Sequence, residues 1–238
     1  MYSACPTFLG ILDVYGTSFL KNYISQHVLK EHVKNSRFFK QFGGISMDMK
    51  GMKLGIALTG SFCTFDATFN IIKQLVKNGA DVTPIISYNV DLLDTRFWLA
   101  DDVKQILIEL TGKKIIKEIT TAEPVGPKNL FDVLTILPCT GNTLAKLASA
   151  ITDTPVLMAA KSQLRNKKPV VIAVSTNDGL SNNATNIGKL MNTKNIYFVP
   201  FSQDDPIKKE LSTVFLENRV IETIIEALNQ KQIQPVIC

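Results

Sequence analysis

Five short runs of apolar residues, separated by helix-like segments, constrain the fold of this chain more than any other feature. The runs read KLGIAL at 53–58, VTPII at 82–86, DVLTIL at 132–137, PVVIAV at 169–174 and NIYFV at 195–199. A strand that is apolar on both faces must be covered on both faces, which is typical of a parallel sheet between helices. The sequence therefore predicts a doubly wound, Rossmann-like α/β domain with a mainly parallel sheet.

The segments between these runs have the spacing of amphipathic helices. Phe65, Phe69, Ile72 and Val76 follow one another at intervals of four, three and four residues, which places them on one helical face. Similar spacing predicts helices from residue 101 to 111, over 142–151 and 184–192, and near the C-terminus. We expect residues 47–238 to form this single domain.

Residues 1–46 lack this alternation of strand-like and helix-like segments, and they carry +3 of the chain's net charge of +5. Gly43-Gly44 can be encoded by a purine-rich GGAGGN, which resembles a bacterial ribosome-binding site, and methionines follow at 47, 49 and 52. One hypothesis is that translation starts at one of these methionines. The alternative is a genuine disordered or helical extension with a Gly-Gly linker.

Composition excludes several classes of function. The net charge of +5 is small and forms no basic stripe with interleaved aromatic residues, so we expect no nucleic-acid partner. No apolar run approaches the roughly 20 residues of a membrane helix, and the N-terminus does not resemble a signal peptide, so we expect a cytoplasmic protein. The four cysteines are scattered, which predicts neither a metal site nor structural disulfides.

Small polar residues follow four of the predicted strands. They are Thr-Gly-Ser at 59–61, Ser87, PCTGNT at 138–143 and STND at 175–178. The carboxyl ends of parallel strands are where such domains bind ligands, and the N–H groups of the helices that begin there favour an anion. Each loop alone is also an ordinary helix cap or turn. GxGxxG and GxxxxGK[ST] are both absent, which argues against the dinucleotide and P-loop modes.

The loop PCTGNT resembles the Pro-Ala-Ser-Ala-Asn-Thr signature of the flavin-containing cysteine decarboxylases, with Pro138, Asn142 and Thr143 in register. PVVIAVSTN at 169–177 resembles their PVVIAPAMN and keeps Asn177. From about Lys53 to Val236 the chain more closely resembles the family of dipicolinate synthase B subunits, through motifs that include GIALTGSFCTFDA, DTRF, AEPVGPK, TGNTLAKLA and TKNIYFVPFSQDDPIKK.

The resemblance implies a flavoprotein-type fold that binds FMN. By motif match, Gly60 and Ser61 would meet the phosphate or ribityl chain, and Ser87 would lie near the isoalloxazine. The residues that would hold the phosphate at a helix start are Thr140, Gly141, Asn142 and Thr143. Asn177 would lie near the flavin or the substrate. The related decarboxylases use a histidine base, whereas this chain has only His27 and His32, so its catalytic residues stay unassigned.

The resemblance also implies an activity. With an A subunit that carries NAD(P), the chain would oxidise dihydrodipicolinate to dipicolinate in the mother cell of a sporulating bacterium, as a homo-oligomer. The substrate would be a planar dianion, for which Arg96, Lys161 and Arg165 are candidate cations. For Lys161 and Arg165 the alternative is a solvated helix end.

Two other functions stay open. The chain could be a non-catalytic subunit that positions the A subunit and keeps a vestigial flavin pocket, or a relative that acts as a flavin-linked decarboxylase or prenyltransferase. The missing histidine weighs against decarboxylation. Cys63 and Cys139 lie on the predicted site loops, but no basic neighbour that could activate a thiol is identifiable, so we interpret them as packing residues.

Overall fold

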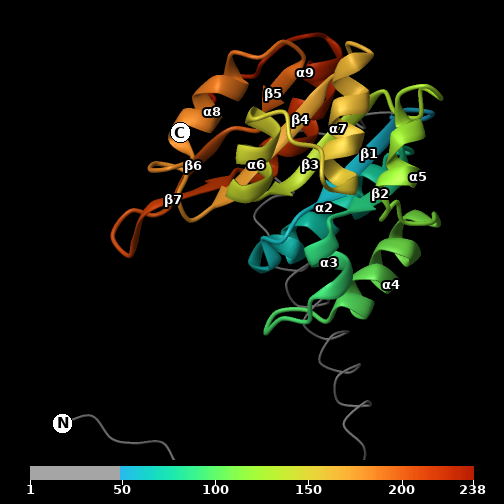
Figure 1. Ribbon diagram of the computed structural model, residues 1–238, viewed down its shortest axis with the longest axis horizontal. Coiled ribbons are helices and arrows are strands. Elements are labelled where there is room, and N and C mark those ends of the chain that lie inside the picture. Colours follow the sequence, from blue (N-terminus) through green and yellow to red (C-terminus); the bar gives the residue numbers. More distant parts are fainter. Residues whose placement is uncertain (1–48) are drawn as a thin grey trace, which may run out of the picture. The chain divides into compact units, whose positions relative to one another are not determined.

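The sheet of this domain is mainly parallel, as the sequence predicts (Figure 1). The computed structural model describes residues 49–238, so the expected extension at 1–46 and the start at Met47 lie outside the described residues. The parallel strands are β1 (Lys53–Leu58), β2 (Asp81–Ile86), β3 (Val133–Cys139), β4 (Val170–Thr176) and β5 (Ile196–Phe198). Each of the five apolar runs is a strand, which confirms the α/β class.

The strands lie in the order β2-β1-β3-β4-β7-β6, with β5 paired to β4 outside this path. β6 (Phe201–Asp205) and β7 (Lys209–Phe215) form an antiparallel hairpin, which the sequence did not predict. The residues of both strands next to the hairpin turn are polar and mostly exposed, so neither strand has the pattern of an apolar run. The hairpin joins the sheet at the carboxyl end of β4, where Ser175 pairs with Val214 and Thr176 with Thr213.

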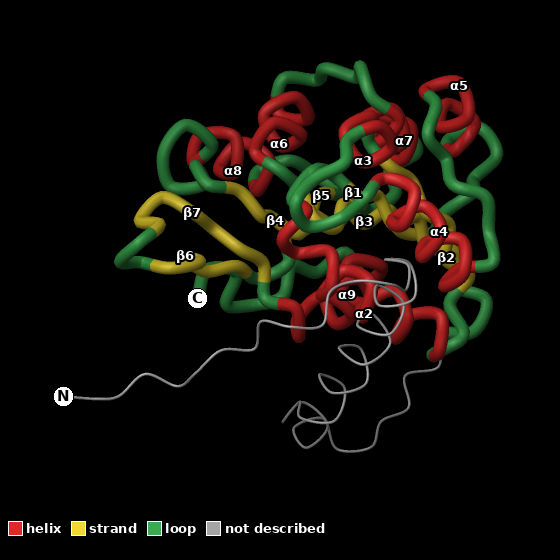
Figure 2. Tube along the Cα trace, turned by 90° about the horizontal axis from the view of Figure 1, so that it is seen from below, coloured by secondary structure: helices red, strands yellow, loops and turns green. Residues whose placement is uncertain are grey.

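Helices cover both faces of the sheet (Figure 2). They are α2 (Phe65–Lys77), α3 (Tyr88–Leu92), α4 (Ala100–Thr111), α5 (Ile119–Ala122), α6 (Gly141–Ala148), α7 (Pro155–Arg165), α8 (Ala184–Met191) and α9 (Val220–Leu228). α2, α4 and α9 contribute to one hydrophobic core, and α5 to α8 contribute to a second core. Within residues 49–238, no helix is both long and apolar enough to span a bilayer.

Met49 belongs to the first core, which bears on where the folded domain must begin. Its side chain is 2% exposed, and its N–H donates to the carbonyl of Asn78 at 3.0 Å. We therefore expect a chain that begins at Met52 to be about 2–5 kcal/mol less stable than one that begins at Met47, because it lacks a buried methionine. Denaturant unfolding of the two shortened chains measures the difference, and equal midpoints would contradict the role assigned to Met49.

Candidate functional site

A buried threonine links the carboxyl ends of β1 and β3. Thr59 follows β1 directly and is 0% exposed. Its Oγ1 donates to the carbonyl of Pro138 at 2.8 Å and accepts the N–H of Thr140 at 2.9 Å. Since the two strands are parallel neighbours, their exits lie side by side, and Thr59 fixes one exit against the other.

A pair of serine hydroxyls extends this link to β4. Ser61 Oγ and Ser175 Oγ are 2.8 Å apart, and Ser175 is buried. Cys63 lies at the exposed side of this pair, with its Sγ 3.9 Å from Ser61 Oγ. The structure thus brings together residues from three of the predicted loops, 59–61, 138–143 and 175–178. They meet at the edge of the sheet where the sequence predicts a ligand.

The predicted phosphate loop forms the first turn of α6. Thr140 caps the helix, because its Oγ1 accepts the N–H of Thr143 at 3.4 Å. The N–H groups of Gly141 and Asn142 have no acceptor within the helix, as is general for a first turn. Asn142 has an exposed side chain, whereas Gly141 and Thr143 are buried. The start of α6 can therefore present donors to an anion.

A polar cluster that the sequence did not predict packs directly on Gly141. The Asp178 carboxylate accepts from Thr176 Oγ1 at 2.6 Å and from Asn183 Nδ2 at 2.9 and 2.8 Å. A Cβ on Gly141 would lie 2.5 Å from Thr176 Oγ1 and from Asn183 Nδ2, and 2.7 Å from Asp178 Oδ1. Only glycine fits at this position without a shift of the cluster.

Ser87, at the end of β2, holds a hydroxyl without a partner in the described part of the chain. The residue is 9% exposed, and its Oγ is buried and makes no hydrogen bond. Its N–H donates to the carbonyl of Leu58 at 3.0 Å, which keeps it next to the exit of β1. A buried hydroxyl without a partner is costly, so this position points to a ligand that would supply the bond.

The remaining predicted flavin residues lie on the same loops. Gly60 follows Thr59, and a Cβ there would meet Phe62 and Asn89 only at ordinary contact distances of 3.4–3.8 Å. Asn177 is exposed, and its carbonyl oxygen accepts from Ser212 Oγ at 3.4 Å. Gly60 therefore leaves more room beside the backbone than Gly141 does.

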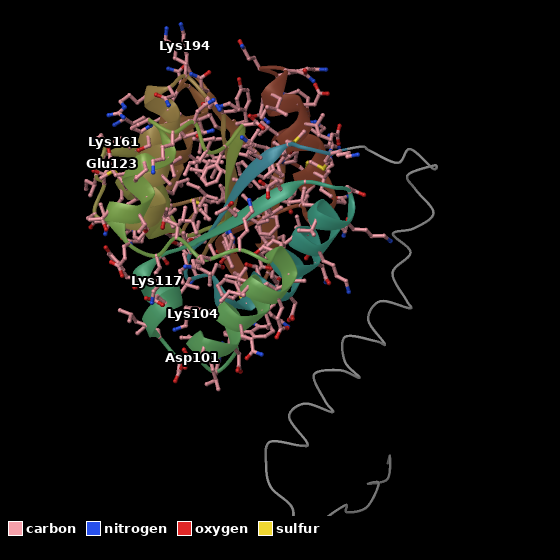
Figure 3. All side chains as sticks on the ribbon, turned by 90° about the vertical axis from the view of Figure 1, so that its right-hand side faces the viewer. Asp101, Lys104, Lys117, Glu123, Lys161 and Lys194 are labelled. Atoms are coloured by element: carbon pink, nitrogen blue, oxygen red, sulfur yellow. The ribbon has the colours of Figure 1, made fainter. Side chains whose placement is uncertain are left out.

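The structure does not bring the three predicted cations together. Arg96 is exposed on the segment between α3 and α4, which follows the carboxyl end of β2. Lys161 and Arg165 lie in the last half of α7, and this helix ends just before β4 begins, so both residues are toward the amino edge of the sheet. Figure 3 shows Lys161 beside Glu123 and far from Asp101 and Lys104 of α4.

An ion-pair cluster holds α3 against its neighbours. The Asp91 side chain is 10% exposed and lies 3.4 Å from Lys104 Nζ and 3.3 Å from Lys117 Nζ. Lys104 Nζ also contacts Asp101 at 2.8 Å, and this hydrogen bond lowers the pKa of Asp101 and raises that of Lys104. The cluster fixes α3, the helix that begins directly after Ser87.

The thiol of Cys139 is an unsuitable nucleophile. The residue is 0% exposed, and burial raises the pKa of its thiol well above the usual range. A thiol that stays protonated is a weak nucleophile, so the geometry agrees with a packing role.

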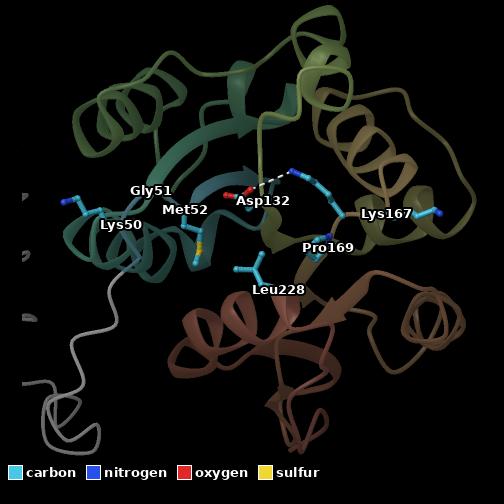
Figure 4. Close-up of a pocket in the computed structure, with 8 residues that line it drawn as sticks. Lys50, Gly51, Met52, Asp132, Lys167, Pro169 and Leu228 are labelled. Carbon is cyan, nitrogen blue, oxygen red and sulfur yellow. Dashed lines mark ion pairs between the residues drawn. The ribbon is translucent and has the colours of Figure 1, made fainter.

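A hollow in the described part of the chain lies at the opposite edge of the sheet. It has a volume of about 490 Å³ and is lined by residues that precede β1, β3 and β4, among them Met52, Asp132 and Pro169 (Figure 4). Lys168 Nζ lies 3.8 Å from Asp132 Oδ1 and donates to the carbonyl of Phe131. Ligands of doubly wound domains bind at the carboxyl edge, so we place the candidate site there.

Comparisons with known proteins show which family this chain belongs to. The family model described as Flavoprotein matches residues 45–232. The B subunit of dipicolinate synthase from Bacillus subtilis (strain 168) is 48% identical over 189 residues, which cover 79% of this chain and 94% of that protein.

Solved structures give the same result. The crystal structure of the dipicolinate synthase B subunit from Bacillus halodurans C has a TM-score of 0.74 and 44% identity, covering 81% of this chain and 98% of its own. The FMN-dependent cysteine decarboxylase SpaF shares the fold, with a TM-score of 0.56 and 19% identity over 75% of this chain and 98% of its own. The chain therefore belongs to the flavoprotein family, as a homologue of the B subunit of dipicolinate synthase.

Proposed function

We propose that this chain binds FMN at the carboxyl edge of its sheet and acts with an A subunit to oxidise dihydrodipicolinate to dipicolinate. Identity of 48% to a dipicolinate synthase B subunit supports the reaction. The observation that supports the binding site is the buried hydroxyl of Ser87, which has no partner among residues 49–238 and lies beside the linked exits of β1, β3 and β4. We extend this proposal to NAD(P) on the A subunit and to action in the mother cell of a sporulating bacterium.

The residues at this edge fit the donor and acceptor groups of FMN. Gly60 and Ser61 and the first turn of α6, Thr140–Thr143, would hold the phosphate or ribityl groups, since both segments offer hydroxyls and N–H groups. Ser87 would donate its free hydroxyl to the ring system. Asn177 would meet the ring or the substrate with its exposed amide.

Aromatisation of a dihydropyridine removes a hydride and a proton. Bound FMN would supply a hydride acceptor. This chain's residues would bind and orient the planar dicarboxylate at the mouth of the site, where the exposed guanidinium of Arg96 suits a carboxylate. Histidine is absent after residue 32, so the proton must pass to another group of this chain, to the A subunit or to water.

The purified full-length chain tests the proposal directly. We expect a yellow protein, or one that FMN renders yellow, with absorbance near about 450 nm from the cofactor. Reconstitution with the A subunit, with and without FMN, then measures dipicolinate formation. A colourless chain that cannot be loaded, yet supports the A subunit fully, would overturn the flavin proposal and favour the non-catalytic role.

Replacement of Ser87 by alanine separates a ligand role from a structural one. Ser87→Ala removes a buried hydroxyl that has no partner in the described domain, so we expect the ligand-free protein to gain about 1 kcal/mol of stability. FMN binding should weaken about tenfold, because the ligand loses one hydrogen bond. Thermal melts of the FMN-free protein and fluorescence titration with FMN give the two values. Unchanged FMN affinity would remove Ser87 from the site.

A further inference from the structure

A second hollow at the amino edge of the sheet is lined by more lysines than carboxylates. Its volume is about 260 Å³, and it lies beside the first residues of β1 and β2. We call it the lysine hollow. Its polar lining residues are Lys53, Asp81, Thr83, Lys113, Lys128 and Asn129.

The register of β1 and β2 brings two of these side chains to one face of the sheet. Lys53 pairs with Asp81, and each is the first residue of its strand. Side chains alternate along a strand, so Lys53 shares a face with Ala57, and Thr83 shares a face with Ile85. Ala57 and Ile85 both belong to the second core. Lys53 and Thr83 therefore lie on the face that α5 to α8 cover.

Lys113, in the segment after α4, reaches the amino end of β2. Its Nζ forms an ion pair with Asp81 and donates to Thr83 Oγ1 at 3.2 Å. Asp81 is the carboxylate that lines the hollow, and it is thereby engaged by one lysine. The ammonium groups of Lys53 and Lys128 form no ion pair within residues 49–238.

A turn that the proposed flavin site does not use forms another wall. The motif AEPVGPK at 122–128 ends in Lys128. The carbonyl of Gly126 accepts from Asn166 Nδ2, at the end of α7, at 2.6 Å and from the N–H of Asn129 at 3.0 Å. The turn is therefore fixed to α7, and Lys128 and Asn129 extend from a fixed backbone.

The hollow of about 490 Å³ at the same edge differs in how its lysines are placed. There Lys168 lies 3.8 Å from Asp132 and donates to the carbonyl of Phe131. Figure 4 shows that Lys50 and Lys167 point away from this hollow on either side. Its lysines therefore do not converge on one ligand.

We propose that the lysine hollow binds a small dianion, a phosphate or a dicarboxylate, through Lys53, Lys113 and Lys128. Three ammonium groups against one carboxylate leave an excess of positive charge, and an anion between them relieves their mutual repulsion. Thr83 accepts from Lys113 and keeps its own O–H to donate, and the exposed Asn129 amide is a further donor. The volume is below the roughly 300–1,000 Å³ of drug-sized pockets, which suits a small anion.

This inference does not rest on the proposed function, because the lysine hollow is at the edge opposite the proposed FMN site. An anion bound there would not compete with FMN. Every titration contains FMN, so that the start of α6 offers no second anion site. The lysine variants locate the binding whether or not FMN is held.

Calorimetric titration of the full-length chain with inorganic phosphate and with succinate tests the proposal. We expect saturable binding of at least one of these anions at one site per chain. Lys53→Gln and Lys128→Gln should each weaken it about tenfold, and the double variant at least about 100-fold, because each loses a charge-assisted contact. Lys73→Gln is the matched control, since it removes the same charge from an exposed position on α2. It should change the affinity less than about twofold.

Chemical acetylation gives a second measurement, at each lysine separately. Mass spectrometry of the acetylated peptides should show that the bound anion slows modification of Lys53 and Lys128 and leaves Lys73 unchanged. Protection by phosphate alone identifies a phosphate site, and protection by succinate alone identifies a dicarboxylate site. Binding of neither anion, equal effects of Lys73→Gln and Lys128→Gln, or no protection of Lys53 and Lys128 would overturn the proposal.

Discussion

Gly141→Ala is expected to reduce FMN affinity by at least about 100-fold, because the start of α6 would be displaced. The added Cβ would lie 2.5 Å from Thr176 Oγ1 and from Asn183 Nδ2. Neither atom can retreat freely, because Thr176 Oγ1 and Asn183 Nδ2 both donate to the Asp178 carboxylate. The first turn of α6 must therefore shift, and overpacking of this kind costs about 1–3 kcal/mol of stability.

Gly188→Ala is the matched control for this prediction. Gly188 lies within α8, and a Cβ there would meet no atom within 4 Å. Alanine in place of glycine in a helix stabilises by about 0.5–1 kcal/mol, so this variant should melt at the same temperature as the unmodified chain or slightly above it. Fluorescence titration and thermal melts of both variants give the comparison. If Gly141→Ala keeps full FMN affinity, then the start of α6 is not part of the FMN site.

Much of the fold could be predicted from the sequence because buried parallel strands are apolar on both faces. KLGIAL and PVVIAV have no polar face, and the structure buries β4 almost completely. The hairpin could not be predicted in this way. Its residues from Gln203 to Glu210 are mostly exposed and polar, and the hairpin is held by a turn in which Asp205 Oδ1 accepts two backbone N–H groups.

The placement of the site loops also followed from the order of elements. Thr59, Ser87, Thr140 and Ser175 each come at or just after the carboxyl end of a parallel strand, so the topology alone brings them to one edge. The same reasoning applied to α7 would have excluded Arg165 from the candidate site. The helix precedes β4, so its C-terminal end lies toward the amino edge of the sheet.

The Asp178 cluster depended on a contact that the sequence does not encode locally. STND at 175–178 draws attention to Asn177 through the family motif, but the side chains of this segment that pack on Gly141 are those of Thr176 and Asp178. Asn183, five residues later, completes the cluster from the start of α8. Only the path of the loop shows that these residues meet α6.

Thr59→Val is expected to destabilise the domain by about 2–4 kcal/mol, although valine has nearly the same shape as threonine. The substitution would remove the side-chain partner of two backbone groups, the buried carbonyl of Pro138 and the partly buried N–H of Thr140. Thr121→Val is the control, since Thr121 is exposed and its hydroxyl donates only to the carbonyl of Glu118. That change should cost less than about 0.5 kcal/mol.

Chemical denaturation of the FMN-free protein measures both threonine variants, and equal losses of stability would contradict the linking role of Thr59. The same substitution should also weaken FMN binding, because the exits of β1 and β3 carry Gly60, Ser61 and Thr140 on either side of this one hydroxyl. If Thr59→Val destabilises the domain but leaves FMN affinity unchanged, the two loops do not act on the flavin together. The phosphate would then be held by one loop alone, which substitution of Ser61 or of Asn142 by alanine would identify.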